Sequence, residues 1–180
     1  MNIVYENASQ NDSYGIAHVS AHSWKETYTG ILPDDYLNDR IENIKESTIK
    51  TKEFVRNYPG EYIVAKDGDN VIGILAYRKS DDNEYKEYGY LEALYILKKY
   101  QGYGIGKELF KKAIIGLKNM GYNKMYLECM TGNDTLNFYK KYLGFIHKNS
   151  NYSIDKVGPV KVDIILFDDL DRVISKINEN

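Results

Sequence analysis

A glycine-rich turn between a buried strand and an amphipathic helix constrains the fold of this chain more than any other feature. The run 91–97 is almost wholly apolar, too short for a free-standing helix and rich in strand-forming residues. After the turn, apolar side chains recur at helical spacing from Ile105 to Met120, with mostly charged side chains between them. Residues 124–130 form a further apolar run. This order predicts a βαβ unit with two parallel strands.

The turn itself, residues 101–107, has the chemistry of an anion site. The first turn of a helix carries backbone N–H groups without intrahelical acceptors, and glycines let a phosphate approach the main chain closely. Gln101 and Lys107 add side-chain donors at its rim. The alternative, that the glycines only form a tight turn, fits these residues equally well.

Three phosphate-binding patterns compete for this turn. A Walker loop requires glycine and Ser or Thr where the chain has Gln101 and Glu108, and a dinucleotide fingerprint requires a glycine where Lys107 stands. The pattern that fits is Gln/Arg-x-x-Gly-x-Gly/Ala after a buried strand, with Gln101, Gly104 and Gly106 in its defining positions. This motif resembles the coenzyme A loop of the GNAT (general N-acetyltransferase) superfamily.

The resemblance implies a mixed α/β fold with acetyl-CoA as co-substrate. The GNAT fold has a twisted, mostly antiparallel sheet of about six or seven strands, flanked by helices, in which one parallel pair splays apart. The pantetheine arm of acetyl-CoA enters that gap and pairs with main-chain groups, while the diphosphate rests on the glycine-rich turn. The coenzyme contacts implied for this chain are Leu94, Tyr95, Ile96, Gln101, Gly102, Tyr103, Gly104, Ile105, Gly106, Lys107 and Asn133.

The remaining elements follow the GNAT order up to about Phe167. The patterns predict strands at 2–6, 62–66, 71–77, 145–152 and 159–167, and helices at 8–28, 34–56 with an interruption near 43–47, 133–142 and 168–177. We expect a single GNAT domain over residues 1–180, with residues 168–180 as a C-terminal helical extension.

Acetyl transfer to an amine requires a group that takes a proton. An alkylamine has a pKa of about 10.4, so at neutral pH roughly one molecule in a thousand is the nucleophile. Glu92 is the one carboxylate inside the apolar strand, and it matches a strand glutamate that many GNAT enzymes use as the base. The alternative is a carboxylate that only points outward from a strand edge.

The departing thiolate requires a proton donor, for which the resemblance implies Tyr139. The segment 133–145 is similar to the family pattern Asn-x-x-Ala-x-x-Phe-Tyr-x-x-x-Gly-Phe, in which the tyrosine lies near the coenzyme sulfur. The spacing differs by one residue on each side of the tyrosine. Either Tyr139 is the acid and the helix end absorbs an extra residue, or Asn133 and Gly144 keep their positions and Lys140 takes the place of the tyrosine. We favour Tyr139 because helix ends tolerate an added residue.

The acceptor half of the site is less constrained. The segment around Trp24 and Tyr28 resembles the helices that border the acceptor pocket in bacterial GNAT proteins, although the two rings could simply be a hydrophobic staple. With the acidic loop at 81–87, these rings suggest a small cationic amine as the acceptor. Two alternatives stay open: transfer to a protein N-terminus or lysine, and a non-catalytic module that senses acyl-CoA.

Composition excludes other classes of protein. The chain has 180 residues and a formal net charge of −2, with no basic block, so nucleic acid is a poor candidate partner. It lacks a recognisable signal peptide or membrane-spanning run, so we expect a cytoplasmic protein, monomeric or homodimeric. Cys129 is the only cysteine, and His18 with His22 has no third ligand. We therefore expect no metal and no covalent enzyme intermediate.

Overall fold

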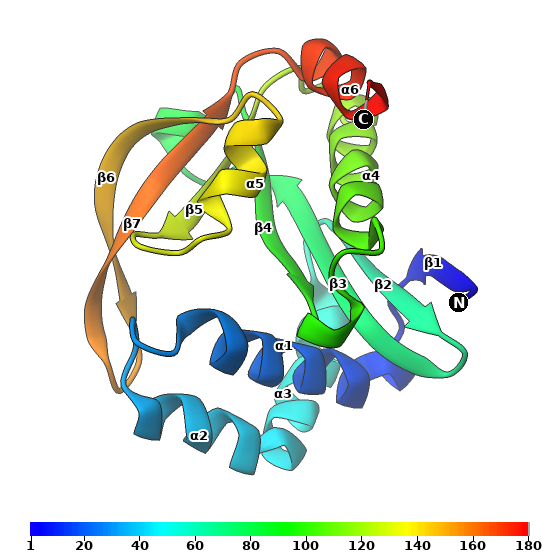
Figure 1. Ribbon diagram of the computed structural model, residues 1–180, viewed down its shortest axis with the longest axis vertical. Coiled ribbons are helices and arrows are strands. Elements are labelled where there is room, and N and C mark those ends of the chain that lie inside the picture. The colour runs from blue at the N-terminus through cyan, green and yellow to red at the C-terminus, as the bar shows by residue number, and fades with distance from the viewer. Residues whose placement is uncertain (180) are drawn as a thin grey trace. The chain divides into compact units, whose positions relative to one another are not determined.

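The structure is a computed structural model, which describes residues 1–179 (Figure 1). The strands are β1 (Ile3–Asn7), β2 (Glu61–Asp67), β3 (Asn70–Lys79), β4 (Gly89–Ile96), β5 (Met125–Met130), β6 (Phe145–Ile154) and β7 (Gly158–Phe167). The α-helices are α1 (Ser13–Tyr28), α2 (Asp34–Glu42), α3 (Ile44–Asn57), α4 (Ile105–Asn119), α5 (Leu136–Lys141) and α6 (Leu170–Asn178). Single turns of 3-10 helix lie at η1 (Gln10–Asp12), η2 (Asn83–Tyr85) and η3 (Lys98–Tyr100).

The seven strands form one mixed sheet in the order β1-β2-β3-β4-β5-β7-β6. The pairs β1–β2, β5–β7 and β6–β7 are antiparallel, whereas β4 and β5 are parallel. The predicted mixed sheet and its single βαβ unit are confirmed. The pattern could identify this unit because a long apolar strand followed by a helix and another strand requires a crossover between parallel strands.

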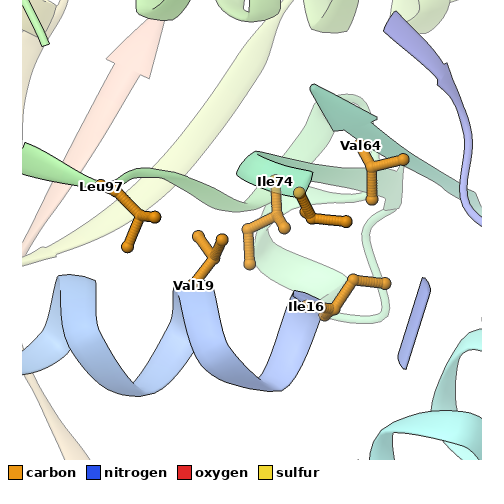
Figure 2. Close-up of a cluster of buried hydrophobic side chains, with 6 residues drawn as sticks. Ile16, Val19, Val64, Ile74 and Leu97 are labelled. Atoms are coloured by element: carbon orange, nitrogen blue, oxygen red, sulfur yellow. The ribbon is translucent and has the colours of Figure 1, made fainter. Parts of the chain in front are cut away.

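The chain divides into two compact units, and the first comprises Met1–Ala76 with Ala93–Phe110. One cluster of its core joins α1 to the strands, as Figure 2 shows, and consists of Ile16, Val19, Val64, Val71, Ile74 and Leu97. Close packing of α1 on β3 depends on Gly15, because a Cβ atom there would lie 2.5 Å from the Val71 side chain. Packing of this kind sets where α1 lies over the strands.

The start of α1 differs from the expectation of one helix over residues 8–28. Ser9 caps the 3-10 turn η1 with its side chain, and the Ser9 N–H donates to the Asp12 carboxylate at 2.7 Å. The α-helix begins only at Ser13. The apolar periodicity did not predict this later start, because the reciprocal hydrogen bonds between Ser9 and Asp12 form a 3-10 turn where the α-helix was expected to begin.

The second unit comprises Tyr77–Glu92 with the chain from Lys111 onward. Here β6 and β7 form a long hairpin beside β5 (Figure 1). The C-terminal helix α6 buries Leu170, Val173 and Ile177, and its Lys118–Asp171 ion pair ties it to α4. The predicted C-terminal helix therefore packs against the rest of this unit.

Candidate active site

The glycine-rich turn lies between η3 and α4 in the first unit. Gly102 and Gly104 have φ angles of 83° and 81°, a region that side chains with a Cβ atom rarely adopt, so glycine is required at both. The Gln101 side chain folds back and donates from Nε2 to the Ile96 carbonyl oxygen at 3.1 Å. Gln101 therefore fixes the turn to the end of β4.

The same turn presents unpaired backbone donors. The first N–H of α4 to reach a protein acceptor is that of Glu108, which donates to the Gly104 oxygen at 3.0 Å. The N–H groups from Ile105 to Lys107, in the first turn of α4, have no acceptor within the helix. Gly106 lets the first turn of the helix lie against Ile96, since a Cβ atom there would approach Ile96 Cδ1 to 3.0 Å. A row of free N–H groups at a helix N-terminus is suited to a diphosphate.

The parallel ladder between β4 and β5 is very short. It pairs only Gly89 with Met125 and Tyr90 with Tyr126. The rest of the eight-residue β4 has no pairing with β5. The predicted splayed pair is therefore confirmed, and the backbone of Leu94, Tyr95 and Ile96 lies beyond the end of the ladder.

Glu92 lies two residues beyond Tyr90, the last residue of β4 in this ladder, and belongs to the second unit. Its carboxylate accepts a hydrogen bond from Arg78 Nε at 2.8 Å, and the pair is largely buried, with side-chain exposures of 16% for Arg78 and 30% for Glu92. Arg78 also pairs with Asp81, and its guanidinium lies 5.2 Å from the centre of the Tyr90 ring. Glu92 is thus fixed in an ion pair rather than pointing freely outward.

Three residues near the end of this ladder, in the same unit, were not among the residues predicted for the site: Tyr90, Tyr126 and Glu128. The two tyrosine rings stack at 4.7 Å with an interplanar angle of 20°. Desolvation, followed by the negative charge of Asp82, raises the pKa of Glu128 above its usual value. The signal available was the repeated triplet Tyr-Leu-Glu, which occurs in both parallel strands.

Tyr139 lies in α5, which is shorter than the expected helix over residues 133–142. Asn133 accepts a hydrogen bond from the Thr135 N–H at its side-chain oxygen, at 2.9 Å, and so forms a turn ahead of the helix. Tyr139 is buried and its ring packs 6.4 Å from that of Phe167, whereas Lys140 is exposed. This burial favours the register in which Tyr139, and not Lys140, takes the family tyrosine position.

The end of α5 has a regular hydrogen-bond pattern. The Gly144 N–H donates to the Tyr139 oxygen at 2.9 Å, and the Leu143 N–H donates to the Lys140 oxygen at 3.1 Å. These two bonds form a Schellman ending with Leu143 in its left-handed position, at a φ of 72°.

Trp24 and Tyr28 form an aromatic group with Tyr95 in the first unit. The Trp24 and Tyr28 rings meet edge to face with their centres 5.1 Å apart, and the Tyr28 and Tyr95 hydroxyl oxygens are 3.5 Å apart. Arg40 lies over Trp24, with its guanidinium carbon 4.1 Å from the ring centre. A cation therefore already covers the Trp24 ring.

Two other carboxylates, one of them in the acidic loop at 81–87, are partly neutralised. Asp34 pairs with Lys25 at 2.7 Å, and Glu84 pairs with Lys148 at 2.7 Å. Within residues 1–179 there is no group of three His, Cys, Asp or Glu side chains that could hold a metal ion. No helix in the same range has the length and apolar character needed to cross a membrane.

Comparison with known proteins gives the family. The model of the Acetyltransferase (GNAT) family matches residues 21–145. The chain is 29% identical to the uncharacterized N-acetyltransferase YuaI of Bacillus subtilis over 140 residues, which cover 78% of this chain and 79% of YuaI. It is also 32% identical to N-alpha-acetyltransferase 30 of Schizosaccharomyces pombe over 117 residues, covering 61% of this chain and 77% of the yeast protein.

A solved structure agrees with the fold. PaiA N-acetyltransferase from Thermoplasma acidophilum, in complex with coenzyme A, has a TM-score of 0.65 and 21% identity, covering 90% of this chain and 98% of PaiA. The fold and the matches define an acetyl-CoA-dependent N-acetyltransferase, as the sequence predicted. The chain belongs to the acetyltransferase (GNAT) family.

Proposed function

We propose that the chain transfers the acetyl group of acetyl-CoA to a primary amine of a small, cationic molecule by direct attack in a ternary complex. The observation that carries this proposal is Glu92, fixed by Arg78 at the point where the β4–β5 ladder ends. A carboxylate at that point suits an ammonium group that must approach a thioester and lose a proton.

The coenzyme is assigned to the turn and to the end of β4. The turn from Gly102 to Lys107 holds its diphosphate, chiefly through the first N–H groups of α4, with Gln101 keeping the turn in place. The pantetheine arm pairs with the main chain of Leu94, Tyr95 and Ile96, and Asn133 contacts it from the turn ahead of α5. Backbone pairing fixes the thioester without requiring particular side chains.

Two side chains carry the proton transfers. Glu92 receives the proton of the acceptor ammonium, directly or through water, so that the neutral amine can attack the thioester carbonyl. Tyr139 gives its hydroxyl proton to the departing thiolate. Each contributes about 100 to 10,000-fold to the rate, and holding the two substrates together contributes more.

The acceptor is assigned to the side of the site bordered by Trp24 and Tyr28. A second candidate acceptor is the α-amino group of a protein N-terminus, which the similarity to N-alpha-acetyltransferase 30 favours. The two candidates differ in what lies beyond the reacting amine: a second cationic group in a polyamine, or a peptide backbone in a protein.

Release of free thiol from acetyl-CoA tests these roles. We would compare spermidine, lysine and a short peptide with a free N-terminus as acceptors. The proposal predicts turnover with the small amines, and turnover with the peptide alone would replace it by the second candidate. Glu92→Gln and Tyr139→Phe should each lose about 100-fold or more in kcat while still binding acetyl-CoA.

Two matched variants control for indirect effects. Asp81→Asn removes the other carboxylate on Arg78 and leaves Glu92 in place. Tyr142→Phe removes a hydroxyl from a buried tyrosine at the end of the same helix. Both should keep kcat within about threefold of the wild type. A loss as large as that of Glu92→Gln or Tyr139→Phe would mean that those effects are structural.

A further inference from the structure

Arg40 of α2 lies against the aromatic group formed by Trp24, Tyr28 and Tyr95. Its guanidinium carbon is 4.1 Å from the centre of the Trp24 ring. Its Nη2 donates to the Ser20 hydroxyl at 3.1 Å, and Ser20 lies one helical turn before Trp24 on α1. The guanidinium therefore extends from α2 across the face of α1 that carries the indole ring.

The protein satisfies the donors of Arg40 only in part. Its acceptors are two neutral hydroxyl groups, that of Ser20 and, at 3.4 Å, that of Tyr36. The Arg40 Nε atom is buried and has no hydrogen-bond partner. Within residues 1–179, the guanidinium forms no ion pair with a carboxylate. A charge that is shielded from water costs free energy unless an opposite charge compensates it.

Arg78 shows what such compensation looks like in the same chain. It also lies over an aromatic ring, that of Tyr90, but it is bound by the carboxylates of Glu92 and Asp81. The other two arginines, Arg56 and Arg172, are solvent-exposed. Arg40 is therefore the half-buried arginine whose charge the described residues leave open to an anion.

The aromatic group connects Arg40 to the coenzyme side of the first unit. The centre of the Trp24 ring is 6.5 Å from that of Tyr95, and the hydroxyl oxygens of Tyr28 and Tyr95 are 3.5 Å apart. The main chain of Tyr95 belongs to the part of β4 assigned above to the pantetheine arm. Because Trp24 contacts both Arg40 and Tyr95, Arg40 borders the side of the site assigned to the acceptor.

We propose that Arg40 is a specificity-determining residue that binds a carboxylate of the acceptor. The acceptor class is then a small cationic amine that also carries a carboxylate, as lysine does. A planar guanidinium with five N–H donors matches a carboxylate better than any other side chain does. The inference rests on the proposed function and narrows its substrate class: of the small amines compared there, it favours lysine over spermidine.

A purely structural role for Arg40 makes a different prediction. If the guanidinium only supports the Trp24 ring and joins α2 to α1, its removal disturbs the binding of every acceptor alike. If it binds a carboxylate, its removal weakens only acceptors that carry one. The two roles are therefore separated by a pair of substrates that differ in the carboxylate alone.

The test compares lysine with lysinamide, which keeps both amines and replaces the carboxylate by a neutral amide. Free-thiol release at saturating acetyl-CoA gives kcat and KM for each. The wild type should favour lysine in kcat/KM about tenfold or more. Arg40→Gln should raise the KM for lysine about tenfold or more, keep kcat within about threefold, and leave both constants for lysinamide within about threefold. The change in the lysine-to-lysinamide ratio cancels the different reactivities of the two substrates.

Two further variants check the assignment. Arg40→Lys keeps the charge but loses the planar fork, so it should retain part of the preference for lysine. Arg56→Gln makes the same change of charge at an exposed position and should alter neither substrate. Equal losses on lysine and lysinamide in Arg40→Gln would overturn the inference, as would a wild type that uses lysinamide as well as lysine. Failure of the wild type to release thiol with any small amine, although it binds acetyl-CoA, would instead overturn the proposed function.

Discussion

Leu143 ends α5 in a backbone conformation that favours glycine. Its φ is 72°, and the residue is 40% exposed, so little packing compensates for the strain. Leu143→Gly should raise the free energy of unfolding by about 0.5–1 kcal/mol, as measured by urea denaturation. Lys140→Gly, in the regular turn of the same helix, should lower it by about 1 kcal/mol. A destabilising effect of Leu143→Gly would contradict the Schellman ending.

Cys129 is buried and lies opposite Asp163 in the β5–β7 register. Desolvation, followed by the Asp163 charge, raises the pKa of its thiol to about 11, so the thiolate needed for nucleophilic attack is scarce at neutral pH. Cys129→Ala should therefore keep kcat within about twofold, since direct transfer uses no thiol. Mass spectrometry of the enzyme mixed with acetyl-CoA alone should find no acetylated Cys129, and a trapped adduct would contradict direct transfer.

Residue types in known motifs could be recognised from the sequence, but their partners could not. The Gln-x-x-Gly-x-Gly turn carried its own spacing, so Gln101, Gly104 and Gly106 were identified together. The stacking of Tyr90 on Tyr126 was missed because it depends on the register between β4 and β5. That register cannot be predicted from the local sequence of either strand.

At the scale of elements, the start of the chain is fixed by a charged cluster. Lys66 of β2 lies 2.6 Å from Asp12 and 2.5 Å from Glu6. Although burial alone would raise the pKa of Asp12, the hydrogen bonds from Lys66 and Ser9 outweigh it, and the pKa lies below its usual value. The cluster ties η1, at the entrance to α1, to the strands.

Removal of Lys66 should therefore destabilise the protein. Lys66→Met leaves the buried Asp12 carboxylate without its cation, which should cost about 3 kcal/mol at pH 7 in urea unfolding. Lys50→Met, which breaks the exposed pair with Glu46, should cost less than about 0.5 kcal/mol. An equal loss in the two variants would show that burial of Asp12 is energetically unimportant.

The same pair predicts a pH dependence of stability. Because the folded pKa of Asp12 is lowered, its contribution is fully present above the unfolded value of about 3.9 and is lost as the pH falls through the folded value. The stability difference between the wild type and Lys66→Met should therefore shrink below about pH 4. A difference that stays constant down to pH 2 would contradict this assignment.

The spacing of apolar residues predicted most helices and strands, whereas local side-chain hydrogen bonds determined where several of them begin or end. The hairpin of β2 and β3, the helix α4 and the strand β5 lie close to their predicted positions. The predicted first residues of α1 and α5 were wrong, because Ser9 and Asn133 make local hydrogen bonds that compete with helix formation. Such side-chain bonds depend on conformation and leave little trace in hydrophobic patterns.

At the scale of the whole molecule, we propose that residues 1–180 form one GNAT domain. The strand β4 and the helix α4 each contribute residues to both compact units. Unfolding of either unit would therefore break an element on which the other unit depends. Thermal unfolding should therefore be a single transition with equal calorimetric and van't Hoff enthalpies. Two resolved transitions would mean that the units unfold independently.

Acetyl-CoA binding to the glycine-rich turn is the central claim, and a thermal shift measures it most directly. Gly104 and Gly121 lie at opposite ends of α4 with φ angles of 81° and 95°, and a Cβ atom at either would meet nothing within 4 Å. Gly104→Glu and Gly121→Glu therefore introduce comparable backbone strain, but only the first places a carboxylate on the turn.

At a concentration 100 times the dissociation constant, acetyl-CoA should add about 2.7 kcal/mol to the stability of the wild type. We expect a clear rise in melting temperature for the wild type and for Gly121→Glu, and none for Gly104→Glu. A wild-type protein that shows no shift at millimolar acetyl-CoA, or an equal shift in both variants, would contradict the assignment of the coenzyme to this turn.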